Sequence, residues 1–233
     1  MTLRLPPSFF PPAESADRHG LVAVTDEMTP DLVLDAYCHG IFPWSEGPVG
    51  WFSPEPRAIF ERDKIRLPGN LKRLQRQAGF RATCDQAFGA VMRACATAHA
   101  ASGTWITDGF LNSYGALHEH GFAHSVEIWQ AEQLVGGIYG VQVNGLFAGE
   151  SMFHTVSNAS KVAFAHLVAQ LDLLGVVLFD AQVPNDFTVG LGAVSIRRKE
   201  YLARLKRALA TPSACSGSPW PSPPPSPFSD RNT

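Results

Sequence analysis

The dipeptide Asn144-Gly145 constrains the fold more than any other feature of the sequence. Asn-Gly readily takes the two positive φ values of a two-residue type I′ hairpin turn, and apolar, β-favouring runs flank it here. The sequence therefore predicts antiparallel strands at residues 135–143 and 146–153. Side chains alternate with period two, so this turn pairs Tyr139 with Glu150.

Four glycines interrupt these strands: Gly136, Gly137, Gly140 and Gly149. Glycine inside a strand often marks a bulge or the close approach of a ligand or another backbone. Glu150, an acid beside such a gap, is therefore a candidate site residue. The alternative is a glycine-weakened hairpin with a solvated glutamate.

Composition indicates a globular chain without membrane segments. Of its 233 residues 45% are hydrophobic and 17% charged, and no run approaches the roughly 18 apolar residues of a spanning helix. Prolines interrupt the start, which lacks the apolar core of a signal peptide, so a cytoplasmic location is expected. The net charge of −2 means that any nucleic-acid contact needs a local basic patch.

Such a patch lies at residues 63–81, which hold six cations and one acid. Asn70 can cap a helix that projects several of these cations. Phosphate binding and a merely solvated helix face both remain open on this evidence.

Metal binding is not favoured. His118, His120 and His124 share their spacing with no acidic or cysteine ligand, and the four cysteines form no CxxC pair. We expect local hydrogen bonds for these histidines, reduced thiols and no cofactor.

Helices are expected at residues 30–39, 84–101, 108–120 and 198–209, with another from an N-cap at Ser157 to about Leu174. The last 23 residues contain seven prolines and six serines, which predicts a disordered tail.

An apolar strand is predicted at residues 176–183, and it carries Asp180 and Gln182 on one side. A carboxylate and a carboxamide on such a strand are unfavourable unless something binds them. Either these groups serve the function or they form a satisfied structural network.

A series of motifs between Leu21 and Leu205 resembles the leucyl/phenylalanyl-tRNA–protein transferases: GIFPW, WFSPEPRA, GTWIT, HSVEIW, LVGGIYG, FAGESMF, NASK, FDAQVPND and LGA. The resemblance implies an α/β (α+β) protein. A small N-terminal α/β domain (1–62) would precede a domain like the GCN5-related N-acetyltransferases (63–210) with a mostly antiparallel mixed sheet, and a tail (211–233) would follow.

The same resemblance implies an activity. The enzyme would move Leu, Phe or Met from aminoacyl-tRNA to a protein with N-terminal Arg or Lys, marking it for degradation by the bacterial N-degron route. A monomer without cofactor is expected. Phe187 and Gly190 stand where the family usually has His and Ser.

The resemblance also assigns roles to individual residues. Asp180 and Gln182 would lie at the reacting centre, where Asp180 orients Gln182 and the Gln182 carboxamide oxygen accepts a hydrogen bond from the attacking amine. Glu150 and Asn185 would hold the acceptor. The donor pocket would comprise Trp105, Ile138, Phe147, Met152, Leu171 and Phe179. The residues near the terminal adenosine would be Tyr37, Trp44 and Tyr114. The basic patch that meets acceptor-stem phosphates would be Lys64, Arg66, Lys72, Arg73 and Arg76.

If Ile138, Phe147 and Met152 all line one pocket, the simple hairpin register must be broken by a bulge near Gly149. Two other functions remain as alternatives. An acyl-CoA-dependent N-acyltransferase would need a pyrophosphate loop, which residues 154–161 do not provide. A non-catalytic N-degron or tRNA-binding module would give no reason for the Asp180 and Gln182 pair.

Overall fold

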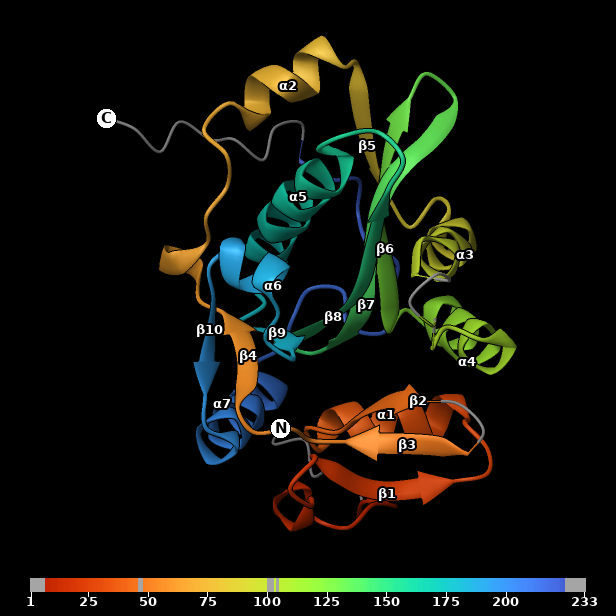
Figure 1. Ribbon diagram of the computed structural model, residues 1–233, viewed down its shortest axis with the longest axis vertical. Coiled ribbons are helices and arrows are strands. Elements are labelled where there is room, and N and C mark those ends of the chain that lie inside the picture. Colours follow the sequence, from red (N-terminus) through yellow and green to blue (C-terminus); the bar gives the residue numbers. More distant parts are fainter. Residues whose placement is uncertain (1–6, 46–47, 100–102, 104, 225–233) are drawn as a thin grey trace.

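The computed structural model describes residues 7–45, 48–99, 103 and 105–224. Within them the chain forms two sheets, a small one near the N-terminus and a larger one with helices on both faces (Figure 1). The small antiparallel sheet has the order β1-β3-β2 and consists of β1 (Leu21–Thr25), β2 (Phe42–Ser45) and β3 (Val49–Phe52). Helix α1 (Pro30–Cys38) packs beside β2 and begins as predicted, because the Thr29 hydroxyl accepts the amide of Leu32.

The larger sheet has seven strands in the order β10-β4-β9-β8-β7-β6-β5. Neighbouring strands are antiparallel except for the parallel pair β8 and β9. The predicted α/β class with a mixed, mostly antiparallel sheet is therefore confirmed. The strands are β4 (Arg57–Phe60), β5 (Phe80–Cys84), β6 (Ala123–Gln130), β7 (Gln133–Val143), β8 (Leu146–His154), β9 (Leu178–Gln182) and β10 (Ala193–Ile196).

Helices cover both faces of this sheet. Helices α3 (Phe88–His99) and α4 (Asp108–Glu119) pack on one face and α5 (Ala159–Leu173) on the other (Figure 1). The remaining helical segments are η1 (Ala13–Ser15), η2 (Arg62–Lys64), α2 (Leu71–Gln77), α6 (Asp186–Gly190) and α7 (Arg198–Ala210). Of the helices that the structure describes, none has both the length and the apolar character that a membrane crossing requires.

The Asn144-Gly145 turn joins β7 and β8 at the predicted place, with Val143 opposite Leu146. The predicted type I′ geometry is wrong, because only Asn144 has a positive φ, of 51°, and Gly145 does not share it. The simple register holds only to Gly149. Beyond it a bulge shifts the pairing, so Tyr139 faces Ser151 rather than Glu150. The bulge turns Glu150 out of the simple alternation.

At Gly140 and Gly136 on β7, the missing side chain makes room for another part of the protein rather than for a ligand. A Cβ at Gly140 would lie 2.2 Å from the carbonyl oxygen of Ala148 across the bulge. A Cβ at Gly136 would lie 2.6 Å from the Cβ of Ala159, so glycine there lets α5 pack directly on β7.

Two expected boundaries differ from the element positions, and one strand was missed. The smaller sheet ends with β3 at Phe52 and the larger sheet begins with β4 at Arg57, which lies ahead of the domain boundary expected at residue 62. Helix α5 begins after Asn158, a residue with φ +70°, and not after an N-cap at Ser157. Strand β5 was not predicted at all, because its five residues include a charged Arg81 beside a run of cations.

The predicted disordered tail is wrong for residues 211–224, which pack against the larger domain; residues 225–233 lie outside the described part of the chain. Trp220 is only 6% exposed. Ser213 and Ser216 hydrogen-bond to the carbonyl of Leu174 and the amide of Asn144. Composition alone missed this because one buried indole and a few well-placed hydroxyls fix the segment.

Candidate active site

A cavity of about 540 Å³ lies where β8, β9, α5, α6 and β2 meet. Its walls are mostly apolar, and part of them is a cluster of three rings from β4, α5 and β9. The ring centroid of Phe60 lies 4.9 Å from that of Phe164 and 4.8 Å from that of Phe179. The polar residues that line it include Glu150 on β8, Gln182 at the end of β9 and Asn185 just before α6. A pocket of this kind suits an apolar side chain joined to a reacting polar group.

The structure brings most of the predicted catalytic and substrate-binding residues to this cavity. Those that line it are Trp44, Trp105, Ile138, Glu150, Met152, Phe179, Gln182 and Asn185. Ile138 and Met152 face each other across β7 and β8, which the bulge permits. The bulge expected near Gly149 is present, but the condition from which it was inferred is not met, because Phe147 does not line the cavity with Ile138 and Met152.

Two predicted donor-pocket residues lie behind the wall instead. Phe147 and Leu171 are 0% and 1% exposed, and neither lines the cavity. Phe147 packs edge-on against Phe179, with ring centroids 5.6 Å apart. These two side chains support the pocket from the core without touching its contents.

Tyr37 and Tyr114 were expected beside the terminal adenosine, yet both rings are buried, at 1% and 0% exposure. No ring face is open for stacking on a base. The Tyr37 hydroxyl donates to Glu150 Oε1 at 2.6 Å and the Tyr114 hydroxyl to Oε2 at 3.2 Å. The two hydroxyls are 2.8 Å apart. Both tyrosines therefore hold the carboxyl of Glu150.

Glu150 is the most strongly held acid at the cavity. Burial raises the pKa of its carboxyl to about 7, and the charge of Asp180 acts in the same direction. Hydrogen bonds from Tyr37, Tyr114 and Gln182 oppose this by favouring the carboxylate. Glu150 can therefore change its protonation state near neutral pH.

Gln182 combines an unusual backbone with two anchoring bonds. Its φ is +60°, a left-handed conformation that a non-glycine residue adopts only when its surroundings hold it there. Its backbone amide donates to Asp180 Oδ1 at 2.8 Å, and its Nε2 donates to Glu150 Oε1 at 2.8 Å. The amide nitrogen thus faces Glu150, and the structure describes no hydrogen bond to the carboxamide oxygen.

Asp180 does not reach the cavity. Its side chain is 0% exposed and forms a two-pronged ion pair with Arg57, at 2.9 and 2.6 Å. The Tyr201 hydroxyl donates to its Oδ2 at 2.7 Å. Asp180 therefore contacts Gln182 through its backbone amide and not through its carboxamide, and its place at the reacting centre stays a prediction.

Sequence reasoning missed several residues of the site. Arg57 lies under the ring of Phe42 and over that of Tyr201, at 4.7 and 4.3 Å from their centroids. Its presence next to the apolar run Ala58–Phe60 was a signal of a buried partner. The aromatic wall formed by Phe60 and Phe164 carried no local signal.

The residues of the basic patch are all exposed, around η2 and α2. The Lys64 side chain forms an ion pair with Glu61, and the backbone amide of Arg66 donates a hydrogen bond to the carbonyl of Leu191. Helix α2 lies over one end of α5, and the smaller sheet lies at the opposite end of the molecule (Figure 1). The side chains of the patch therefore lie on the surface and not in the hydrophobic core.

For three histidines, His118, His120 and His124, the sequence predicts hydrogen bonds to neighbouring groups rather than metal binding. His118 and His120 bond to the carbonyl groups of Ala123 and Ala116, and His124 bonds to Asp85. Within the described residues no cluster of three His, Cys, Asp or Glu side chains could hold a metal ion.

Comparison with known proteins decides the family. The model of the leucyl/phenylalanyl-tRNA protein transferase family matches residues 59–206, and the model of its N-terminal domain matches residues 26–55. The chain belongs to the leucyl/phenylalanyl-tRNA protein transferase family. The two matched segments meet between β3 and β4, where the structure passes from the smaller sheet to the larger one.

Curated members of the family match over most of their length. A leucyl/phenylalanyl-tRNA–protein transferase of Pseudomonas fluorescens (strain SBW25) is 44% identical over 91% of this chain and 94% of its own. One of Xanthomonas campestris pv. campestris (strain 8004) is 45% identical over 89% of this chain and 86% of its own. The solved structure of L-PGS from Bacillus licheniformis is 11% identical, with a TM-score of 0.40 over 82% of this chain and 73% of its own, and adds nothing to the assignment.

Proposed function

We propose that this transferase moves Leu, Phe or Met from its aminoacyl-tRNA to the α-amino group of a protein that begins with Arg or Lys. The observation that carries the proposal is an apolar cavity with Glu150 and Gln182 on its wall, in a chain of this family. The apolar part fits the donor side chain and the polar part fits the acceptor amine.

The reaction needs neither ATP nor another energy source, because the aminoacyl ester is already activated. The acceptor nitrogen attacks the ester carbonyl, a C–N bond forms, and the C–O bond to the ribose of the terminal adenosine breaks. The proton leaves the nitrogen and goes to the ribose oxygen. Holding both reactants in place supplies about 7–11 kcal/mol of the barrier reduction.

Gln182 directs the amine in this scheme. Because Glu150 holds its Nε2, the carboxamide oxygen can accept a hydrogen bond from the attacking nitrogen and aim the nitrogen lone pair at the carbonyl. Asp180 contributes by position, through the backbone of Gln182. The Glu150 carboxylate, with Asn185 at the cavity, attracts the cationic acceptor end.

The rest of the tRNA would meet two further surfaces. Trp44, 41% exposed at the cavity, offers a ring to the terminal adenosine. The basic patch is proposed to bind acceptor-stem phosphates without reading sequence. We propose that the reaction takes place in the cytoplasm, because its substrate is charged tRNA; the new N-terminal Leu or Phe would there mark the product for degradation.

The test is a transfer assay with the purified protein. It is mixed with radiolabelled Phe-tRNA and a protein that begins with Arg, without ATP, and the acid-precipitable label is followed after RNase treatment. The same acceptor with an acetylated N-terminus is the control. Label on the free acceptor alone supports the proposal. Binding of tRNA without transfer would instead favour a binding module and overturn it.

A further inference from the structure

The C-terminal strap, defined as residues 211–224, crosses the back of the donor pocket. Two side chains of the larger domain hold it: Gln170 on α5 donates to the carbonyl of Pro221 at 3.2 Å, and Gln142 on β7 donates to Ser213 at 2.6 Å. Gly217 bonds to the carbonyl of Gly121 at 2.9 Å. The strap therefore has a fixed place, although the family model ends at residue 206.

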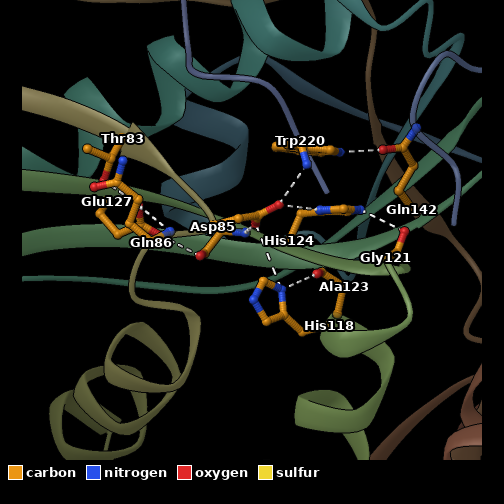
Figure 2. A network of polar contacts seen from close by, with 11 residues as sticks. Thr83, Asp85, Gln86, His118, Gly121, Ala123, His124, Glu127, Gln142 and Trp220 are labelled. Atoms are coloured by element: carbon orange, nitrogen blue, oxygen red, sulfur yellow. Dashed lines mark hydrogen bonds and ion pairs between the residues drawn. The ribbon is translucent and has the colours of Figure 1, made fainter. Parts of the chain in front are cut away.

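Trp220 is the anchor of this strap. Figure 2 shows its indole above His124, and the two rings stack with centroids 4.5 Å apart and 7° between planes. Its Nε1 donates to Gln142 Oε1 at 2.6 Å, and its backbone amide donates to Asp85 Oδ2 at 3.0 Å. Every polar group of the indole is thus satisfied, which permits its burial.

A second face of the indole reaches the donor pocket through one intervening ring. Trp220 packs on Phe147 with centroids 5.6 Å apart, and Phe147 packs on Phe179 at 5.6 Å. Phe179 lines the cavity, whereas Phe147 does not. Gln142, which binds the indole, is also the cross-strand partner of Phe147. The position of Trp220 therefore limits how far Phe147 and Phe179 can retreat.

We propose that Trp220 is a positioning residue that sets the depth of the donor side-chain pocket through Phe147 and Phe179, and so sets the discrimination between Leu and Phe. This rests on the proposed function, because it names a determinant of the donor in that same cavity. Interiors are close-packed, so a ring removed from this stack leaves space into which the two phenylalanines shift. A deeper pocket fits the smaller Leu side chain less well than Phe.

The experiment compares equilibrium binding with transfer for the full-length protein and Trp220→Ala. Calorimetry with amide-linked Leu-adenosine and Phe-adenosine, which cannot react, gives the ratio of the two affinities. Transfer from Leu-tRNA and Phe-tRNA gives the ratio of kcat/KM. We expect both ratios to move toward Phe by about tenfold, the scale of a poorly filled apolar pocket. Inhibition by uncharged tRNA and the KM of the acceptor should stay unchanged.

Two further variants keep the test decisive if Trp220→Ala does not fold. Trp220→Phe keeps a ring on Phe147 but loses the bond to Gln142, and should show a smaller shift of the same sign. Pro219→Ala, at an exposed neighbouring position of the strap, should leave both ratios unchanged.

The outcomes separate the two proposals. Unchanged ratios in folded Trp220 variants overturn the role of Trp220, whatever the transfer rate. Failure of the unaltered protein to bind either adenosine compound overturns it as well. Binding with a shifted ratio but no transfer supports the role of Trp220 and overturns the proposed function alone.

Discussion

Arg57 and Asp180 form an ion pair that neither solvent nor the cavity reaches, with exposed side-chain fractions of 1% and 0%. The pair joins neighbouring strands β4 and β9, and Asp180 also accepts the amide of Gln182. Arg57 in addition donates to the carbonyl of Gly40, in the segment that leads into the smaller sheet. The pair therefore sets the place of Gln182 relative to both parts of the protein.

Asp180→Asn should destabilise the fold and slow the chemical step. It leaves the Arg57 guanidinium buried without a counter-charge, a loss of about 3–5 kcal/mol in the free energy of unfolding. Urea denaturation measures the loss, and Arg57→Met should reproduce it, because it leaves Asp180 equally unpaired. At temperatures where the variant is folded, kcat should fall more than the KM of the donor rises. An Asp180→Asn enzyme with unaltered kcat at saturating donor contradicts the positioning role.

The rate of transfer should change with pH as the carboxyl group of Glu150 titrates. Its pKa is raised to about 7, so the carboxyl is protonated below pH 7 and no longer attracts the cationic acceptor. We expect kcat/KM for the acceptor to rise from pH 6 to 8. The acceptor amine, with a pKa of about 7.7–8.0, titrates nearby and contributes to the same rise. Glu150→Gln keeps the amine titration but removes that of the carboxyl, so the ratio of the two profiles should rise through about pH 7. A constant ratio would exclude Glu150 as the titrating group.

The sequence predicts local features well where the chemistry is local. Asn144-Gly145 marked the place of the turn between its two strands, and Asn144 takes the positive φ that a tight hairpin turn needs, although Gly145 does not take the second one. A shifted register beyond Gly149 followed from the sequence only on the condition that Ile138, Phe147 and Met152 share one pocket. In the structure the Ala148 carbonyl comes so close to Gly140 that an added Cβ would lie 2.2 Å from its oxygen. Period-two alternation carries no information about such a contact.

Long-range partners could not be predicted from one chain. Asp180 was recognised as a polar residue needing a partner, but Arg57 lies 123 positions away and no motif connects the two. The alternatives of a functional group and a structural network both hold in part. Gln182 lines the cavity, whereas Asp180 belongs to the network behind it.

Binding of tRNA should weaken with salt, and the weakening should depend on the basic patch. Replacing Arg73 and Arg76, both exposed on α2, with Ala should raise the KM of the charged tRNA. It should also lower the slope of log affinity against log salt by about 1 for each lost phosphate contact. The control is Lys199→Ala, which removes the charge of an exposed residue on α7, away from the patch. Equal salt slopes for the unaltered protein and the double variant would count against the patch.

Gly140→Ala should damage both stability and activity, although it adds a single methyl group. Its Cβ would lie 2.2 Å from the Ala148 oxygen and 2.5 Å from the Phe147 ring, so the bulge that places Glu150 must shift. Overpacking of this kind lowers the free energy of unfolding by about 1–3 kcal/mol. Urea denaturation measures the loss, and kcat should fall with it as Glu150 moves away from Gln182.

The matched control for this change is Gly115→Ala on α4, where an added Cβ meets nothing within 4 Å. Alanine is the better helix former by about 1 kcal/mol, so this variant should be slightly more stable than the unaltered protein, with the same kcat. If both alanine variants behave alike, the bulge does not need glycine. The place of Glu150 must then be fixed by the hydrogen bonds to its carboxylate from Tyr37, Tyr114 and Gln182.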